Sequence, residues 1–172
     1  MDNQSNLPYH GFNLKKSLKL GIVGWGRAVG WLLIGIVDSL EYIPKDHSEY
    51  KKLINILEEI ISSIKEYQKE DGAFAWQISA REGISDSSAT SMIAYALKKA
   101  IFINVISNEN SMILNKCIQF LSSNSEKGVV SQCSAECGGL GIYPQFYSNF
   151  PWSQGPTTSL ISLYLLEEKN KI

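Results

Sequence analysis

The sequence contains few of the residues that build metal sites and disulfides. Its 172 residues include two histidines and three cysteines, Cys117, Cys133 and Cys137. An odd number of cysteines argues against a disulfide framework and favours a reducing, cytoplasmic location. Because Cys133 and Cys137 have only two histidines to combine with, they make a poor zinc ligand set. We therefore expect no metal and no cofactor.

Excess charge, long apolar segments and a signal peptide are also missing. Lysine and arginine number 16 and acidic residues 17, for a net charge of −1, and no basic cluster marks a nucleic-acid-binding face. The apolar run WLLIGIV falls far short of the roughly 18 residues of a membrane span. The start MDNQSNLPYHGFN lacks the basic-then-apolar order of a signal peptide. We expect one domain that binds neither nucleic acid nor membrane.

Helical periodicity dominates what remains. The patterns predict helices over about 30–43, 48–69, 87–103 and 111–123, and a last one that starts near Gly155. The first of these ends at Pro44, which restricts the residue before it. In the second, leucines and isoleucines share one face and lysines and glutamates the other, as in a helix that lies on the outside of a domain.

These helices form a repeat. A charged amphipathic helix, a turn and an uncharged helix follow one another twice, and the uncharged segments DSSATSMIAYAL (86–97) and GPTTSLISLYLL (155–166) match in spacing. Residues 1–29 correspond to a turn segment, and 30–43 to the uncharged helix of an earlier unit. A repeat of roughly 50 to 60 residues made of helix pairs is typical of a stacked helical array. The uncharged helices are then the inner ones, and their N-terminal ends gather on one face.

The residues at these gathered ends suit a sugar that carries a carboxylate. Aromatic rings stack on sugar rings, hydroxyl groups bond sugar hydroxyls, exposed helix N-termini favour anions, and arginine grips a carboxylate through two N–H groups. The segments GWGRAVGW, ISDSSATS and NFPWSQGPTTS supply Trp25, Arg27, Trp31, Asp86, Ser87, Ser88, Trp152, Thr157 and Thr158.

The motifs PYHGFN, GWGRAVGWLLIGIVDSLEYIP, QKEDGAFAWQ, SSATSMIAYAL and GIYPQFYSNFPWSQGPT resemble, in this order, the C-terminal half of the unsaturated glucuronyl and rhamnogalacturonyl hydrolases, glycoside hydrolase families 88 and 105. The resemblance covers nearly the whole chain. It implies an all-α fold, an incomplete (α/α)6 barrel of the α/α toroid type with about three of six helical hairpins. It also implies a substrate class, oligosaccharides that end in a 4,5-unsaturated uronic acid.

The resemblance assigns roles to several residues. The family motif WxRGNGW maps to Trp25, Arg27 and Trp31, which would line the subsite of the unsaturated sugar, and the family histidine maps to His10. Ala28 and Val29 replace the small residue and asparagine of that motif, so one hydrogen bond to the sugar is lost. In the family an aspartic acid protonates C4 of the sugar and water adds at C5, which is vinyl-ether hydration with a carboxyl group as acid and base.

The family's catalytic aspartates lie upstream of its histidine, where this chain begins. We therefore expect a chain that is a fragment, that obtains the other half barrel from a second copy or a partner, or that has no hydrolase activity. Within the chain, Asp86 is read as an N-cap or, less simply, as a catalytic acid. Asp38 follows Trp31 on the same helical stripe, so it is either a satisfied polar residue or an acid that faces the cavity.

The aromatic candidates have alternative interpretations too. Trp25, Arg27 and Trp31 are ligand contacts or a core anchor with an arginine in a structural ion pair. Tyr143 and Trp152 stack on sugar or pack their own loop. Trp76, which follows a turn, is expected to close a helix pair by packing.

Two further functions stay open. One is a catalytically inactive, truncated saccharide-binding or scaffold protein. The other, ranked last, is a different α/α toroid of the terpene-cyclase or lanthionine-cyclase kind, for which the chain offers neither an Asp-rich acid motif nor a Cys/His zinc set.

Overall fold

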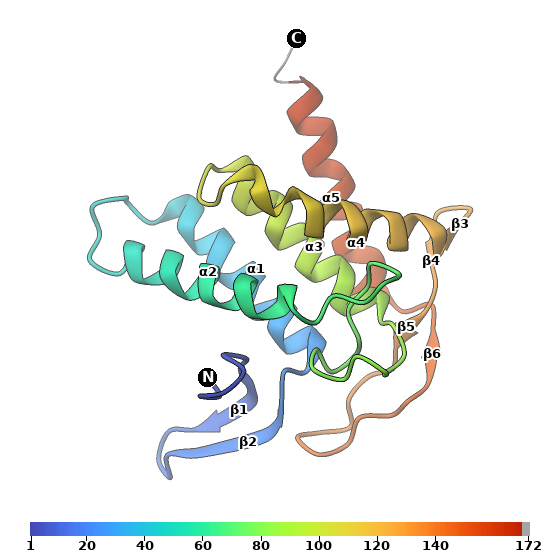
Figure 1. The fold of residues 1–172 in the computed structure, drawn as a ribbon, viewed down its shortest axis with the longest axis horizontal. Helices are drawn as coiled ribbons and strands as arrows, with labels where there is room; N and C mark the ends of the chain where they lie inside the picture. Colours follow the sequence, from blue (N-terminus) through green and yellow to red (C-terminus); the bar gives the residue numbers. More distant parts are fainter. Residues whose placement is uncertain (170–172) are drawn as a thin grey trace.

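The computed structural model describes residues 1–169 and consists of helices joined by long loops (Figure 1). The helices are α1 (Gly26–Tyr42), α2 (Tyr50–Lys65), α3 (Ser87–Phe102), α4 (Ser111–Ser123) and α5 (Pro151–Lys169), with a 3-10 turn, η1, at Asn108–Asn110. The predicted helix over 111–123 agrees with α4, and the one over 87–103 agrees with α3 to within one residue. The predicted helix over 48–69 is longer than α2 at both ends.

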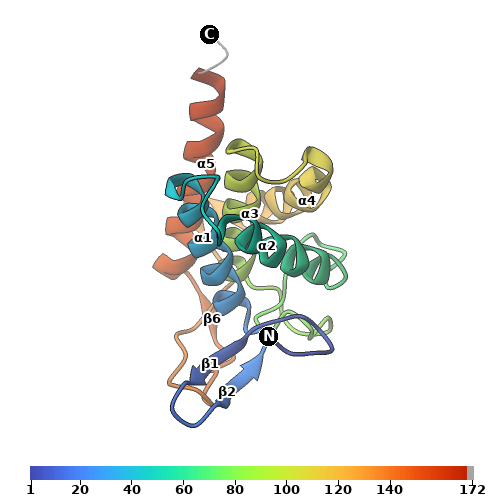
Figure 2. The same ribbon diagram turned by 90° about the vertical axis from the view of Figure 1, so that its left-hand side faces the viewer.

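Short strands accompany the helices, and the sequence analysis did not predict them. They are β1 (Tyr9–Asn13), β2 (Leu18–Val23), β3 (Ser125–Glu126), β4 (Val129–Val130), β5 (Cys133–Ser134) and β6 (Tyr147–Ser148). They pair as three antiparallel two-stranded sheets, β1 with β2, β3 with β4 and β5 with β6. The expectation of a turn over residues 1–29 is therefore wrong, because much of that segment is a β-hairpin. The hairpin lies below the helices in Figure 2.

The inner helices α1, α3 and α5 lie side by side, with α3 packed against α1 on one side and against α5 on the other. In both views all three begin on the lower side of the molecule and run upward (Figures 1 and 2). The outer helix α2 packs against α1, and α4 packs against α3. This arrangement confirms the all-α, partial-barrel architecture that the repeat and the resemblance predicted.

α1 begins at Gly26 and not near Gly30, so residues 26–29, which were expected to precede the helix, form its first turn. The glycines explain the difference. A Cβ atom on Gly26 would lie 2.6 Å from the Cβ of Ala89, and one on Gly30 would lie 2.5 Å from the Cβ of Met92. Since only glycine tolerates such an approach, these residues bring α1 close to α3 and do not mark a turn.

α5 also begins earlier than predicted, at Pro151 and not near Gly155. Proline suits the first position of a helix, where its missing N–H group would have no intrahelical partner. The pair Gly155 and Pro156, which reads as a turn in the sequence, lies inside the helix. Trp152 therefore belongs to the first turn of α5 and not to a loop.

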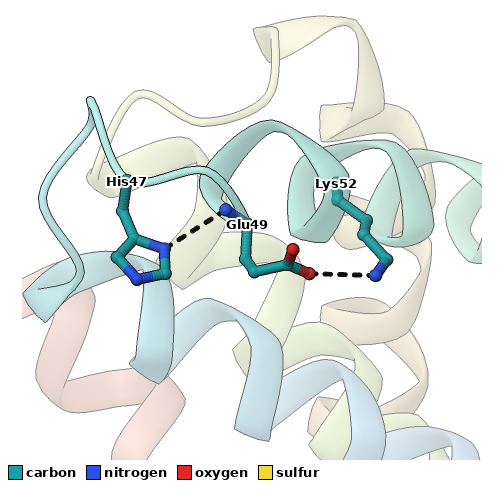
Figure 3. A network of polar contacts seen from close by, with 3 residues as sticks. All are labelled: His47, Glu49 and Lys52. Carbon is teal, nitrogen blue, oxygen red and sulfur yellow. Dashed lines mark hydrogen bonds and ion pairs between the residues drawn. The ribbon is translucent and has the colours of Figure 1, made fainter.

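The second histidine of the chain lies far from the N-terminal ends of the inner helices. His47 is on the loop between α1 and α2, where its Nδ1 accepts a hydrogen bond of 3.2 Å from the backbone N–H of Glu49 (Figure 3). Glu49 also forms an exposed ion pair of 2.9 Å with Lys52 (Figure 3). Exposed ion pairs of this kind contribute little to stability. The three residues therefore fix only the local conformation at the end of this loop.

Two helix flanks remain uncovered. On α5 the side chains of Ile161, Leu165 and Leu166 are about half exposed, as is Trp31 on α1, and Tyr42 of α1 is more exposed still. Both flanks belong to inner helices, which the repeat predicted to be buried. Apolar exposure of this extent is typical of surfaces that take part in interactions. Within residues 1–169, no helix is long and apolar enough to cross a membrane.

Candidate functional site

The first turns of α1, α3 and α5 converge at the lower side of the molecule (Figure 1). Arg27 of α1 donates a hydrogen bond to Ser88 of α3, and its guanidinium carbon lies 5.4 Å from the ring centroid of Trp152 on α5. The predicted gathering of the inner helix ends is thereby confirmed. The loops that follow α2 and α4, and the hairpin β1–β2, surround these ends.

Arg27 is the centre of this convergence, with a side chain only 5% exposed. Its Nη1 donates to Ser88 Oγ at 3.2 Å, to the carbonyl oxygen of Ser134 at 3.0 Å and to Ser134 Oγ. Its Nη2 donates to the carbonyl oxygen of Ala135 at 2.6 Å. No carboxylate in the described part of the chain forms an ion pair with it. The alternative of a structural ion pair is therefore wrong, since oxygens of serine and of the backbone hold the cation.

Two tryptophans flank the guanidinium. Its central carbon lies 4.9 Å from the ring centroid of Trp25 and 5.4 Å from that of Trp152. Trp152 is itself fixed, because its Nε1 donates a 2.9 Å hydrogen bond to the carbonyl oxygen of Ser134. Contacts of a cation with aromatic faces are stabilising when water is excluded. Arg27 is thus held in one position from several sides.

Asp86 is completely buried and caps α3. Its Oδ1 accepts from the backbone N–H groups of Ser88 and Ser134, both at 3.0 Å, and from Ser88 Oγ at 2.7 Å. Its Oδ2 accepts from Ser134 Oγ at 2.8 Å and from Ser88 Oγ at 2.9 Å. The expected N-cap is confirmed. The catalytic role stays a prediction, and the carboxylate as it lies here is too buried to contact a substrate.

The hydroxyl-rich end of α3 is therefore closed, which corrects the expectation of an exposed helix N-terminus there. Ser87 and Ser88 are buried, and the N–H group of Ser87 donates to the carbonyl oxygen of Gln132 at 3.0 Å. On α5, Thr157 and Thr158 bond backbone carbonyl groups of their own helix at 2.8 and 2.9 Å. The hydroxyls of Ser88, Thr157 and Thr158, which were expected to bond a sugar, are thus engaged within the protein, whereas the buried Ser87 Oγ has no hydrogen-bond partner among the described residues.

His10 and Tyr143 form a second cluster beside Trp25. The Tyr143 hydroxyl lies 2.6 Å from His10 Nδ1, and the His10 and Trp25 ring centroids are 4.3 Å apart. Burial lowers the pKa of His10 below its ordinary value, and the charge of Arg27 lowers it further. A neutral imidazole next to a hydroxyl exchanges hydrogen bonds without adding charge to a site that already holds a cation.

Trp76 belongs to the same cluster, although we expected it only to pack a helix pair. Its ring centroid lies 5.5 Å from that of Tyr143, and Tyr143 also contacts the rings of Trp25 and His10. The carbonyl oxygen of Trp76 accepts a hydrogen bond of 2.6 Å from the N–H of Gly26. No sequence signal linked the loop that carries Trp76 to α1, since the contact joins segments about fifty residues apart. The cavity beneath the cluster, bordered by Arg27, measures only about 10 Å³.

A much larger groove of about 500 Å³ runs between α1 and α5. Trp31 and Trp152 border it, and so does Asp38. Asp38 accepts a long hydrogen bond of 3.4 Å from the hydroxyl of Tyr95, so both of its interpretations, a satisfied polar residue and an acid that faces the groove, stay compatible with its position. Trp31 borders this groove but not the small cavity beside Arg27, whereas Trp152 borders the groove and also contacts Arg27. The predicted site residues thus form two neighbouring parts linked by Trp152.

Neither part has the composition of a metal centre. Within residues 1–169, no group of three or more histidine, cysteine, aspartate and glutamate side chains is close enough to hold a metal ion. An arginine and aromatic faces are groups that bind anions and sugar rings.

Several solved structures share this fold. A possible member of the GH105 family from Klebsiella pneumoniae superimposes with a TM-score of 0.89 at 25% identity, over 98% of this chain and 46% of that one. Glycosyl hydrolase family 88 from Bacteroides vulgatus superimposes with a TM-score of 0.75 at 15% identity, over 95% of this chain and 51% of that one. The fold is therefore that of the GH88 and GH105 barrels.

The sequence agrees with the fold. The model of Glycosyl Hydrolase Family 88 matches residues 1–163, and the chain belongs to this family. The unsaturated rhamnogalacturonyl hydrolase YesR of Bacillus subtilis is 26% identical over 136 residues, which are 78% of this chain and 38% of that protein. The chain thus spans less than half the length of this curated relative.

Proposed function

We propose that this chain forms the saccharide-binding part of an unsaturated uronyl hydrolase-like barrel. Its ligand is an oligosaccharide that ends in a 4,5-unsaturated uronic acid, and Arg27 binds the carboxylate of that sugar. The observation that supports this proposal most directly is that Arg27 is a buried guanidinium without an ion pair to any described carboxylate. A buried cation favours an anionic partner, and arginine is suited to bind a carboxylate through two N–H groups.

The surrounding residues support a sugar at this place. The indole rings of Trp25 and Trp152 on either side of Arg27 offer faces for a sugar ring, and the neutral His10 paired with Tyr143 offers hydrogen bonds to its hydroxyls. Because the cavity at Arg27 is so small, we expect the loop that carries Tyr143 to move when a sugar enters. The groove bordered by Trp31 and Trp152 has the size of typical ligand pockets and would hold the following sugar rings.

Hydrolysis by this chain would need a carboxyl group that reaches the sugar. Of the two candidates, Asp38 borders the groove and Asp86 is buried beneath serines. Vinyl-ether hydration requires the acid to stand next to the unsaturated carbon. Asp38 is therefore the acid that a bound oligosaccharide can reach, but it borders the groove of the following rings and not the cavity at Arg27, so in the proposed arrangement neither acid stands next to the unsaturated bond.

The deciding experiment follows the ultraviolet absorbance of the unsaturated bond in a panel of lyase-generated disaccharides, together with calorimetric binding of the same sugars. We expect binding that Arg27→Ala abolishes. The only other arginine, Arg81, is exposed and lies over Tyr67, so Arg81→Ala is the matched control and should bind normally. Equal binding by the wild type and Arg27→Ala would refute the proposal.

A second candidate function is binding without hydrolysis. It is favoured by the burial of Asp86, which removes the only carboxyl group in the Arg27 cluster from contact with a ligand. Binding with no loss of absorbance supports this alternative. Turnover that Asp38→Asn abolishes would exclude it.

We also propose that the bare flanks of α1 and α5 are covered by another half barrel, either a second copy of the chain or a partner. The exposed side chains of Trp31, Ile161 and Leu165 support this, and so does the fact that the chain corresponds to about half of the related barrels. Light scattering coupled to size-exclusion chromatography tests the homodimer. A folded monomer at every accessible concentration would exclude a second copy as the cover.

A cytoplasmic location completes the proposal. The thiols of Cys117, Cys133 and Cys137 are free, and burial raises the pKa of Cys117 to about 12. Free thiols are typical of proteins in reducing compartments. Cell fractionation would test this location directly.

A further inference from the structure

We propose that Asp86 is a positioning residue for Arg27: it fixes the guanidinium through the hydroxyls of Ser88 and Ser134. The inference rests on the proposed function only in its last step, where the positioned Arg27 meets a carboxylate. The arrangement itself is independent of any ligand, since it joins a buried carboxylate on α3 to a buried cation on α1 through two serines.

The two serine hydroxyls face Asp86 on one side and Arg27 on the other. Ser88 Oγ lies 2.7 and 2.9 Å from the two oxygens of Asp86, and Ser134 Oγ lies 2.8 Å from Oδ2. A hydroxyl has one hydrogen to donate. Because each serine gives that hydrogen to the carboxylate, its lone pairs are left to accept from Arg27, whose Nη1 donates to both. The charge of Asp86 thus sets the direction of both hydroxyls.

Asp86 also holds the backbone that receives the remaining bonds of Arg27. The N–H group of Ser134 donates to Asp86 Oδ1 at 3.0 Å, which anchors β5 to the start of α3. Arg27 donates to the carbonyl oxygen of this same Ser134 and to that of the next residue, Ala135. Every acceptor of Arg27 is therefore bonded to Asp86 or lies on the segment that Asp86 anchors.

This arrangement leaves part of the guanidinium for a ligand. The bonds within the described chain engage both hydrogens of Nη1 and one hydrogen of Nη2. The Nε hydrogen and the second Nη2 hydrogen remain, and two adjacent N–H groups match the two oxygens of a carboxylate. A direct ion pair between Arg27 and Asp86 would have consumed this capacity, whereas the intervening hydroxyls preserve it.

Capping alone does not account for the carboxylate. The N–H group of Ser88 bonds only Oδ1, and an asparagine, serine or threonine would cap α3 equally well. Oδ2 accepts only from the two hydroxyls. Asp86→Asn keeps the capping oxygen but puts an NH₂ donor in place of Oδ2, which turns the hydrogen of Ser134 Oγ away from Asp86 and leaves Ser88 Oγ only Oδ1 as an acceptor. The variant therefore separates positioning from capping.

The first test needs no ligand. In the ¹⁵N NMR spectrum of the full chain, the guanidinium of Arg27 should rotate and exchange its hydrogens slowly. We expect both rates to rise at least about tenfold in Asp86→Asn and in Ser134→Ala, because a lost bond to a charged group changes an equilibrium by about this factor or more. Ser153→Ala is the matched control: its buried hydroxyl donates to the carbonyl oxygen of Phe150 at 3.0 Å and forms no hydrogen bond with Asp86 or Arg27 in the described part of the chain, so the rates should not change. Unchanged rates in Asp86→Asn would overturn the inference.

The second test uses an unsaturated glucuronyl disaccharide and its methyl ester, which lacks the negative charge. The wild type and Ser153→Ala should prefer the acid, and the preference should fall about tenfold in Asp86→Asn and Ser134→Ala. A variant that weakens both sugars equally has a general structural defect, and that result overturns positioning. A wild type without preference for the acid refutes the proposed function, while the NMR rates still decide the positioning. Should Asp86→Asn fail to fold, Ser134→Ala decides both tests.

Discussion

α3 and α5 are two inner helices with matching sequence patterns and opposite surroundings. DSSATSMIAYAL and GPTTSLISLYLL align residue by residue, with Leu97 opposite Leu166 and Asp86 opposite Gly155. Twelve of the sixteen residues of α3 are buried, against four of the nineteen of α5, so the same kind of helix is central in one case and peripheral in the other. α3 is buried because other helices pack on both of its sides, and not because of its composition.

Their N-terminal ends differ in the same way. α3 starts at a buried carboxylate surrounded by serines, whereas α5 starts at Pro151 and Trp152, on the border of the groove. The closed end positions Arg27, and the open end offers an aromatic face. The comparison indicates that one inner helix supports the site from behind while the other lines it.

The largest effect on stability is expected from substitutions at the N-terminal ends of α3 and α5. Asp86→Ala leaves Arg27, Ser88 and Ser134 without their common partner, and loss of one member of a buried charged network costs about 3–5 kcal/mol of unfolding free energy. Gly155→Ala at the aligned position should raise stability by up to about 1 kcal/mol, because nothing lies within 4 Å of the added Cβ and alanine favours helix. Urea denaturation measures both. A loss below about 1 kcal/mol for Asp86→Ala would contradict the importance of the closed end.

The next largest effect on stability is expected at the aligned pair of leucines. Leu97 is 1% exposed and Leu166 is 49% exposed. Leu97→Ala should lower the unfolding free energy by about 2–5 kcal/mol, and Leu166→Ala by about 0.5 kcal/mol or less. Denaturation at low protein concentration is the measurement. Equal losses would mean that α5 is as covered in solution as α3.

A smaller effect is expected when a charge is placed on the bare flank. Leu165 is 57% exposed, and Leu165→Lys should weaken the proposed association by about 1–3 kcal/mol while leaving the fold intact. Light scattering would report the change in molar mass. Met112, 67% exposed on the outer helix α4, provides the control Met112→Lys, which should leave the mass as it is. The same mass change in both variants would show that the effect is not specific to α5.

The smallest effect concerns the start of α1, the third inner helix. The pKa of His10 lies below its ordinary 6.5 because of burial and the charge of Arg27. The unfolded chain therefore takes up this proton first, so stability is fully present above pH 6.5 and is lost as the pH falls toward the folded pKa. Denaturation between about pH 5 and 7 should show a shallower slope in His10→Gln. An identical slope would place His10 in solvent.

Much of the helical framework could be predicted because it depends on local pattern. The alternation of charged and uncharged helices gave the inner and outer layers, and the string of cap-forming residues at Asp86 located the start of α3. The first turns of α1 and α5 were missed because Gly26 and Pro156 read as turn residues. In the fold, Gly26 permits close packing on Ala89, and Pro156 continues a helix that Pro151 has already begun.

The candidate site divides in the same manner. Trp25, Arg27 and Trp152 were predicted as site residues from the segments that lead into the inner helices, and His10 from the resemblance. Trp76 and Ser134 were not, because they reach the site from loops whose paths depend on contacts with α1 and α3. No periodicity encodes such a path, and a hydroxyl that receives its direction from a distant carboxylate leaves no trace in local sequence.

By itself, then, the sequence determined the helices, their repeat, and the end of the molecule at which aromatic and charged residues gather, because helix propensity and amphipathic spacing act over a few residues. Only the tertiary structure decided that Asp86 supports Arg27 from beneath, that Tyr143 contacts three aromatic rings, and that Trp31 lies in a separate groove. These relations join α1, α3 and loops far apart in the chain, and packing and burial select them.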